Sequence, residues 1–252
     1  MKKMLASGAI AAVLALSGPA FAADMPVKAA PLVAPIYNWS GFYLGFHDGY
    51  NRASVHDTTA AGFVTDSTVR NWMAGFHTGL QYQFAQTSWG SWVIGVEGSL
   101  NHPLKENNIG NFGACANPAF SCGLRELKDI WTVGGRLGLA FNWGGGWLFG
   151  GDYLLTVSGG WATANFVRAD VLLATGAINA GGGQSIGRHD GSYVGAGLEH
   201  VLARGNLVDW IAGIDYQHIW FNAKGDLDAN GVIHTLSADA DIIRFRTTLK
   251  FK

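Results

Sequence analysis

The residues of this sequence that could do chemistry share one side of a two-residue alternation. Two histidines lie there with five acids and four bases: His47, His77, Glu97, Arg136, Asp152, Glu199, Asp209, Asp215, Arg244, Arg246 and Lys250. Charges of both signs in an enclosed space should pair, because an unpaired buried ion is costly. We therefore predict a network of salt bridges and hydrogen bonds, with an ion path along the same residues as the functional alternative.

A pair of cysteines is the second candidate site. Six residues separate Cys115 from Cys122, and no cluster of histidines lies nearby. In an exported protein this spacing predicts a small loop disulfide. A metal or redox site is the alternative, although the spacing is a poor match to metal-binding motifs.

The remaining motifs do not favour catalysis. Asp226, Asp228 and Asn230 match the first half of a calcium loop, but the twelfth position is Ser237 instead of Glu. His218 has no Ser or Thr on its own predicted strand to serve as a nucleophile. We expect no catalytic residue, no metal site and no cofactor.

The first 38 residues are expected to lie outside the folded domain. Two lysines precede a short apolar stretch, and a small-x-small cleavage site ends at Ala22, which together predict a signal peptide over 1–22. Residues 23–38 are rich in Ala and Pro, which predicts a periplasmic tail. The folded domain is then expected over 39–252.

Alternation of apolar with small or polar residues predicts eight strands in this domain. They cover residues 39–52, 71–84, 90–101, 128–142, 147–160, 191–203, 207–221 and 242–252. Most reach or exceed the roughly 9–11 residues that a tilted strand needs to cross a bilayer. Because one side carries large apolar groups at nearly every position, the pattern favours contact with lipid over a water-soluble sandwich. We predict an all-β fold, an eight-stranded antiparallel up-and-down transmembrane β-barrel.

The connections between the predicted strands alternate in length. Tight turns are expected at 85–89, 142–146 and 203–206, and long loops near 53–70, 102–127, 161–190 and 222–241. Short periplasmic turns and long external loops are typical of outer-membrane barrels. Aromatic residues such as Trp72 and Phe84 gather at the two ends of the strands, as interfacial belts require. Charged residues form only 14% of the chain, against about 25% in soluble domains.

Several short motifs resemble a known family. They are Ala23 to Lys28, Tyr37 to Gly45, Gly95 to Gly98, Arg136 to Gly138, Gly195 to Glu199 and the basic, aromatic final strand. In these the chain is similar to the small outer-membrane β-barrel surface antigens of alphaproteobacteria. The resemblance implies an OmpA-like eight-stranded barrel, often labelled porin-like, with family roles in envelope integrity, surface antigenicity and, in some relatives, haemin binding. Such barrels usually end on an aromatic residue, whereas here Lys252 follows Phe251.

These observations predict a non-enzymatic protein of the cell outer membrane that supports the envelope and displays surface loops around a plugged polar lumen. The alternatives are a small porin-like channel and a surface receptor or adhesin, for example for haemin bound by His56 and His189. Expected partners are outer-membrane lipid and lipopolysaccharide, the β-barrel assembly machinery, and host or envelope partners of the loops. The formal net charge of −1 gives no basic excess for nucleic acid.

Overall fold

A computed structural model describes residues 37–62, 64–104, 113–114, 119–144, 150–172, 174–175, 184–227 and 233–252. The chain divides into two compact units, Met1–Pro35 and Ile36–Lys252, and the described residues all belong to the second. The predicted signal peptide and most of the predicted tail lie outside the described residues. Cys115 lies outside them too, and with it the predicted disulfide to Cys122.

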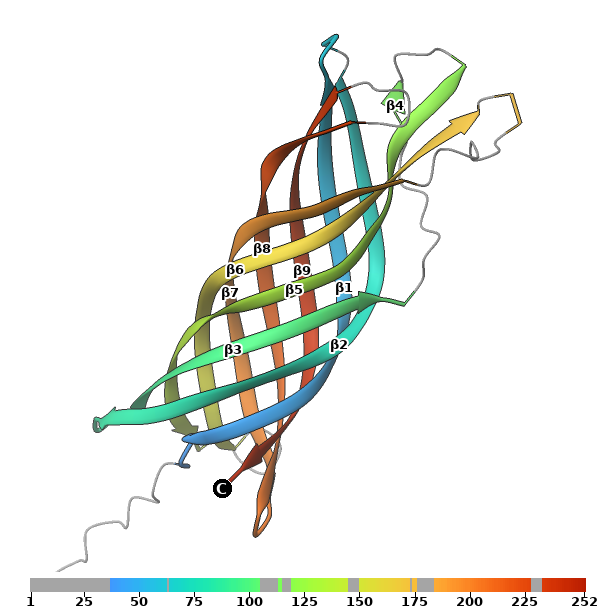
Figure 1. Ribbon diagram of the computed structural model, residues 1–252. Helices are drawn as coiled ribbons and strands as arrows, with labels where there is room; N and C mark the ends of the chain where they lie inside the picture. Colours follow the sequence, from blue (N-terminus) through green and yellow to red (C-terminus); the bar gives the residue numbers. More distant parts are fainter. Residues whose placement is uncertain are drawn as a thin grey trace, which may run out of the picture. The chain divides into compact units, whose positions relative to one another are not determined.

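The second unit is a closed ring of antiparallel strands (Figure 1). The strands are β1 Gly41–Thr59, β2 Val64–Gln86, β3 Ser91–Pro103, β4 Gly113–Ala114, β5 Phe120–Trp143, β6 Gly151–Leu172, β7 Gln184–Arg204, β8 Val208–Leu227 and β9 Ile233–Phe251. Pairing of β1 with β9 joins the two ends of the chain, and pairing of β3 with β5 completes the ring. The two-residue β4 only adds to β5. The other eight strands form the predicted up-and-down barrel, so the predicted fold is confirmed.

The strands are longer than the sequence pattern indicates. β1 has 19 residues and β2 has 23, and the two remain paired as far as Thr58 and Val64. The strands β5 to β9 also continue well beyond their predicted external ends. The prediction of long loops over 53–70, 161–190 and 222–241 is therefore wrong in extent, because much of each segment is strand. The predicted loop near 102–127 is shortened in the same way by the early start of β5.

Near the external end of the barrel, apolar side chains move from the outer face of the wall to the inner face, and polar side chains take their place outside. This change explains the error in the predicted loops. On the membrane side of Tyr50 and Trp72 the outward side chains are mainly apolar. From Arg52 and Arg70 toward the external end of the barrel, the side chains that face away from the lumen are mainly polar. The side chains that face the lumen there include a set of apolar residues: Ala53, Val55, Val69, Ile219, Phe221, Leu236, Ala238, Ala240 and Ile242. The two-residue period continues but its phase inverts, so a search for lipid-facing apolar residues stops at the inversion.

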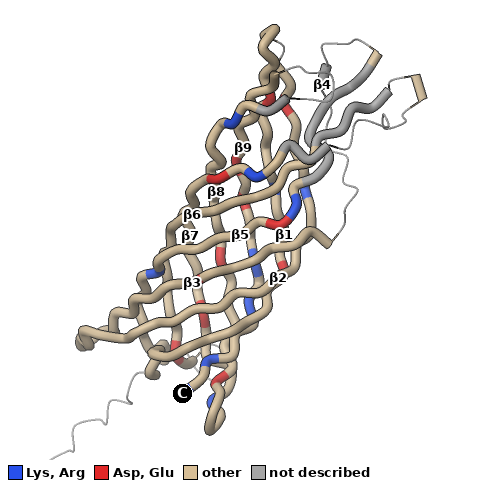
Figure 2. Tube along the Cα trace, viewed as in Figure 1, with Lys and Arg blue, Asp and Glu red and all other residues tan. Residues whose placement is uncertain are grey.

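The outward apolar side chains below this inversion are unusually exposed for large hydrophobic groups. Phe76 is 62% exposed, Leu80 57% and Tyr82 65%. Charged residues are sparse along most of the chain in Figure 2. A continuous apolar surface of this kind is expected where a wall contacts lipid. Among the residues that the structure describes, no helix has the length and hydropathy needed to cross a membrane.

Candidate functional site

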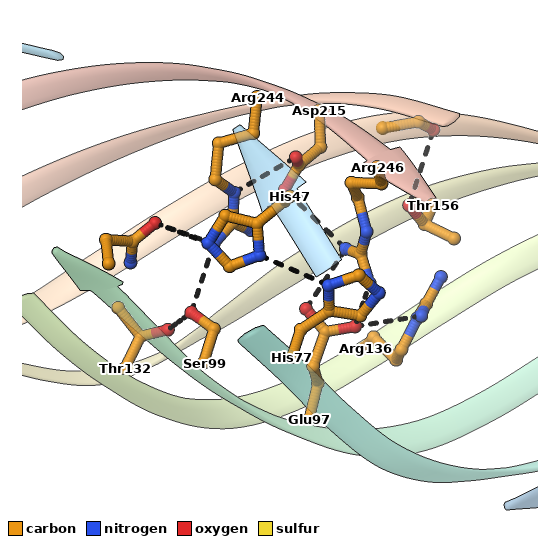
Figure 3. A network of polar contacts seen from close by, with 12 residues as sticks. His47, His77, Glu97, Ser99, Thr132, Arg136, Thr156, Asp215, Arg244 and Arg246 are labelled. Carbon is orange, nitrogen blue, oxygen red and sulfur yellow. Dashed lines mark hydrogen bonds and ion pairs between the residues drawn. The ribbon is translucent and has the colours of Figure 1, made fainter. Parts of the chain in front are cut away.

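The lumen holds a cluster of three guanidinium groups and three carboxylates, in which Arg246 contacts all three carboxylates (Figure 3). Glu97 of β3 accepts two hydrogen bonds from Arg246 of β9, at 3.0 and 2.6 Å. Arg136 of β5 donates to Glu97 at 3.0 Å and to Glu199 of β7 at 2.7 Å. The Tyr43 hydroxyl donates to Glu97 at 2.8 Å and accepts from Arg136 at 2.9 Å. These bonds tie strands from opposite sides of the ring to one another.

Arg244 and Asp215 form the second half of the cluster. Arg244 of β9 donates to Asp215 of β8 through Nε at 3.1 Å and also through Nη2. Its Nη1 donates to Ser99 Oγ at 3.0 Å, and Ser99 in turn bonds Thr132 at 2.7 Å. The Arg244 side chain is only 1% exposed. A buried guanidinium needs this degree of hydrogen bonding to offset the loss of its water shell.

The two lumen histidines lie beside this cluster and bond each other. His47 Nδ1 is 3.2 Å from His77 Nδ1, and the rings are stacked with centroids 5.4 Å apart. His47 Nε2 faces the Asn101 side-chain oxygen at 2.9 Å, so it carries a proton and donates. One consistent arrangement then has His77 Nδ1 donating to His47, and His77 Nε2 accepting from the Thr248 hydroxyl at 2.8 Å. Both rings are neutral in that arrangement, which suits a structural contact between two strands.

The remaining three predicted site residues, Asp152, Asp209 and Lys250, lie at the periplasmic end of the barrel. They bond to residues just before β1, part of which was predicted to belong to the periplasmic tail. The Tyr37 hydroxyl donates to Asp209 at 2.5 Å, and the Tyr37 amide N–H donates to Asp152 at 3.4 Å. Lys250 donates to the carbonyl oxygens of Asn38 and Ser40 at 2.9 and 3.2 Å. Burial and the bond to Asp209 raise the pKa of the Tyr37 hydroxyl, which keeps it a neutral donor.

Trp39 is buried at the same end of the barrel. Its side chain is fully buried, its amide N–H donates to the Gln83 side chain at 2.7 Å, and its carbonyl accepts from Gln81 at 2.6 Å. The Tyr37 ring packs edge-on against Trp39 at 5.1 Å. With Val93, Ala140, Leu154 and Ile211 these two rings form a buried apolar cluster, here called the periplasmic plug.

The lumen is therefore layered along the barrel axis. The apolar residues that face inward at the external end form a second buried cluster, which also includes Met73, Leu127, Ile130, Ala162, Ala164, Phe166 and Tyr193. We call this cluster the external plug. The ion-pair cluster lies between the two plugs. Buried apolar side chains therefore flank the charged groups on both sides, and the geometry fits cross-linking of the wall better than proton transfer.

The structure thus brings His47, His77, Glu97, Arg136, Glu199, Asp215, Arg244 and Arg246 together, whereas Asp152, Asp209 and Lys250 form a separate group. Sequence reasoning missed Tyr43, Tyr37 and Asn101, which complete the bonding of these charges. Tyr43 and Asn101 lie on the inward phase of their strands, so the alternation could have identified them. The contribution of Tyr37 had no sequence signal, because it precedes the first strand.

The two histidines of the haemin alternative do not form a joint site. His56 faces outward on β1 and bonds Asp66 at 2.6 Å. His189 is only 1% exposed and packs edge-on against Phe166 with ring centroids 5.0 Å apart. Since one side chain faces solvent and the other faces the external plug, they cannot ligate one iron from opposite sides.

Comparison with known proteins finds relatives in the outer membrane. No family model matches the chain. Over 97 residues it is 36% identical to the 25 kDa outer-membrane immunogenic protein of Brucella ovis, which covers 36% of this chain and 44% of the relative. The protein of the same name from Brucella abortus is matched at the same identity over 41% of its length. The protein described by this sequence is therefore an outer-membrane protein. The chain spans less than half the length of these curated relatives, and the predicted resemblance to outer-membrane surface antigens is confirmed.

Solved structures of low sequence identity also match the chain. Neisserial surface protein A (NspA) shares 11% identity with a TM-score of 0.31, covering 82% of this chain and 97% of that one. The outer-membrane protease OmpT from Escherichia coli shares 8% identity with a TM-score of 0.36, covering 88% and 100%. At these scores neither likeness carries a functional argument.

Proposed function

We propose that this protein is a non-enzymatic structural barrel that supports the outer membrane and displays its external hairpins, with a lumen that does not conduct. The observation that carries the proposal is the layering of the lumen, in which a buried ion-pair cluster lies between two apolar plugs. Contact with outer-membrane lipid and lipopolysaccharide, assembly by the β-barrel machinery and partners at the external hairpins belong to the same proposal.

Closure of the lumen is supported first by the charges themselves. A conducting path needs polar groups that can exchange partners with passing ions and water. Here Glu97 is shared by two guanidinium groups and a tyrosine, and the Glu97 and Arg136 side chains are 11% and 4% exposed. Buried pairs that lose one partner are strongly destabilised. A passing ion would have to break such pairs, which opposes conduction.

Closure is supported secondly by the two plugs. An eight-stranded barrel has an interior just wide enough for side chains to fill it. The periplasmic plug places the fully buried Trp39 in one mouth, and the external plug places Phe166 and Phe221 in edge-on contact at 5.1 Å near the other. Hydrophobic constrictions block ions by excluding water.

Planar-bilayer recording tests this proposal. The wild-type protein is expected to give no stable open steps. A variant that removes the large side chains of both plugs, Trp39→Ala with Phe166→Ala and Phe221→Ala, is expected to give small steps at most, because water then reaches the ion-pair cluster from both ends. Large, stable steps from the wild-type protein would establish the channel alternative instead.

A further inference from the structure

The outer wall carries two exposed guanidinium groups directly opposite each other. Arg52 of β1 and Arg70 of β2 are partners in the antiparallel register, and both side chains point outward. Like charges that face each other across two strands destabilise a sheet. The Arg70 side chain makes no hydrogen bond or ion pair with any residue that the structure describes. Arg70 therefore lacks a counter-ion among the described residues, and the pair would be stabilised by an anion bound between the two side chains.

The nearby acids compensate this charge only in part. Asp241 of β9 lies opposite Arg52, but it already accepts hydrogen bonds from the Tyr216 hydroxyl at 2.5 Å and from His218 Nδ1 at 2.7 Å. Asp66, four residues from Arg70, is likewise bonded to His56. Asp48 lies on the same outward face, four residues deeper than Arg52, and opposes anion binding.

The depth of the two guanidinium groups is set by the aromatic pair next to them. Tyr50 and Trp72 are the next outward-facing residues of the same two strands, on the membrane side of Arg52 and Arg70. Their rings meet edge-on with centroids 5.8 Å apart. They are 39% and 55% exposed. Tyr and Trp side chains of this kind prefer the headgroup level of a membrane. Arg52 and Arg70 therefore lie where the phosphate groups of outer-leaflet lipids are found.

A hollow continues down the same face of β2. Ala74 follows Trp72 on the outward phase, and its small side chain leaves a hollow of about 480 Å³. Its lining includes the apolar side chains Phe46, Phe76, Leu100 and Trp131, together with the bonded pair His102 and Asp129. An apolar hollow that opens toward lipid suits a hydrocarbon chain.

We propose that Arg52 and Arg70 bind the phosphate of an outer-leaflet lipid, and that an acyl chain of this lipid lies in the hollow over Ala74. Two guanidinium groups can donate several charge-assisted hydrogen bonds to one phosphate, and such bonds are about twice as strong as neutral ones. The site adds a lipid ligand to the proposed function. It rests on the placement in the outer membrane and not on closure of the lumen, so the two proposals can fail separately.

Native mass spectrometry of the detergent-purified protein tests the site. The probes are diphosphoryl lipid A, the same lipid with both phosphates removed, and inorganic phosphate as a competitor. The variant Arg52→Gln/Arg70→Gln removes the guanidinium pair. A matched control, Arg188→Gln/Lys224→Gln, removes two exposed bases on β7 and β8. Two residues after Arg188, the same outer face of β7 carries the acid Asp190 and no aromatic residue. Heat-modifiable gel migration verifies folding of each variant.

Wild-type protein is expected to retain one diphosphoryl lipid A, and Arg52→Gln/Arg70→Gln should weaken this binding by about tenfold or more. The control pair should change it less than about threefold. Ala74→Trp, which fills the hollow and keeps both arginines, should also weaken binding, whereas Asp48→Asn should strengthen it. Equal binding of the dephosphorylated lipid, unchanged binding by the arginine variant, or an equal loss in the control would each overturn the proposal.

Discussion

Replacing Glu97 by Gln is the sharpest test of the ion-pair cluster. The wild-type carboxylate accepts three guanidinium N–H bonds at 2.6–3.0 Å and one from the Tyr43 hydroxyl. The amide keeps the shape but removes the charge, which leaves Arg246 and Arg136 competing for Glu199 and Asp215. Breaking one partner of a buried ion pair costs about 3–5 kcal/mol. We expect the free energy of unfolding to fall by about this amount.

The measurement is urea-induced unfolding in phospholipid vesicles followed by tryptophan fluorescence. The control is Asp66→Asn, which removes a carboxylate whose side chain is 79% exposed in its bond to His56, and which should cost less than about 1 kcal/mol. The double variant Glu97→Gln/Arg246→Gln restores charge balance and should lose less than the sum of the single losses. An effect of Glu97→Gln no larger than that of the control, together with strict additivity, would refute the reasoning.

Three further predictions concern the other layers of the barrel. Because the pKa of Tyr37 is raised in the folded protein, the stability it contributes is present below its usual pKa of about 10 and decreases as the pH rises above that value; unfolding at pH 8 and pH 11 should show a larger loss in the wild type than in Tyr37→Phe. On the lipid-facing wall, Leu80→Arg should destabilise the inserted barrel by about 2–4 kcal/mol, while Thr68→Arg beyond the inversion should cost less than about 1 kcal/mol; refolding yields into vesicles compare them. In the external plug, Ile219→Asp should place an unpaired charge among apolar groups and lower the melting temperature more than Ile219→Ala does, as differential scanning calorimetry would show.

The sequence is informative about the part of the barrel that contacts lipid, because there each strand has two chemically different faces. The alternation placed His77 inward and Phe76 outward, and both lie so. It also placed Arg136 and Glu199, which are far apart in the chain, on the same enclosed surface. Their pairing could not be derived, because it depends on the register of strands that are not neighbours in the sequence.

The external hairpins were misassigned for a definite physical reason. From Arg52 and Arg70 outward, polar side chains face solvent and apolar side chains such as Val55 and Phe221 fill the lumen. Short stretches of Ser, Thr, Asp and Gly are also typical of loops, so the pattern there is ambiguous without knowledge of the strand pairing. The packing of Tyr37 against Trp39 at the periplasmic end was missed because Tyr37 precedes the alternating pattern.

The most direct test of the account measures which face of β2 contacts lipid, using nitroxide labels placed singly at positions 68 to 84 in a variant lacking both native cysteines. In bilayers, accessibility to oxygen should alternate with a period of two and peak at Ala74, Phe76, Leu80 and Phe84. At position 68 the outward label should instead be accessible to a water-soluble nickel complex. A profile without alternation, or access of the nickel complex to position 76 or 80, would contradict the claim that the apolar face lies in the membrane.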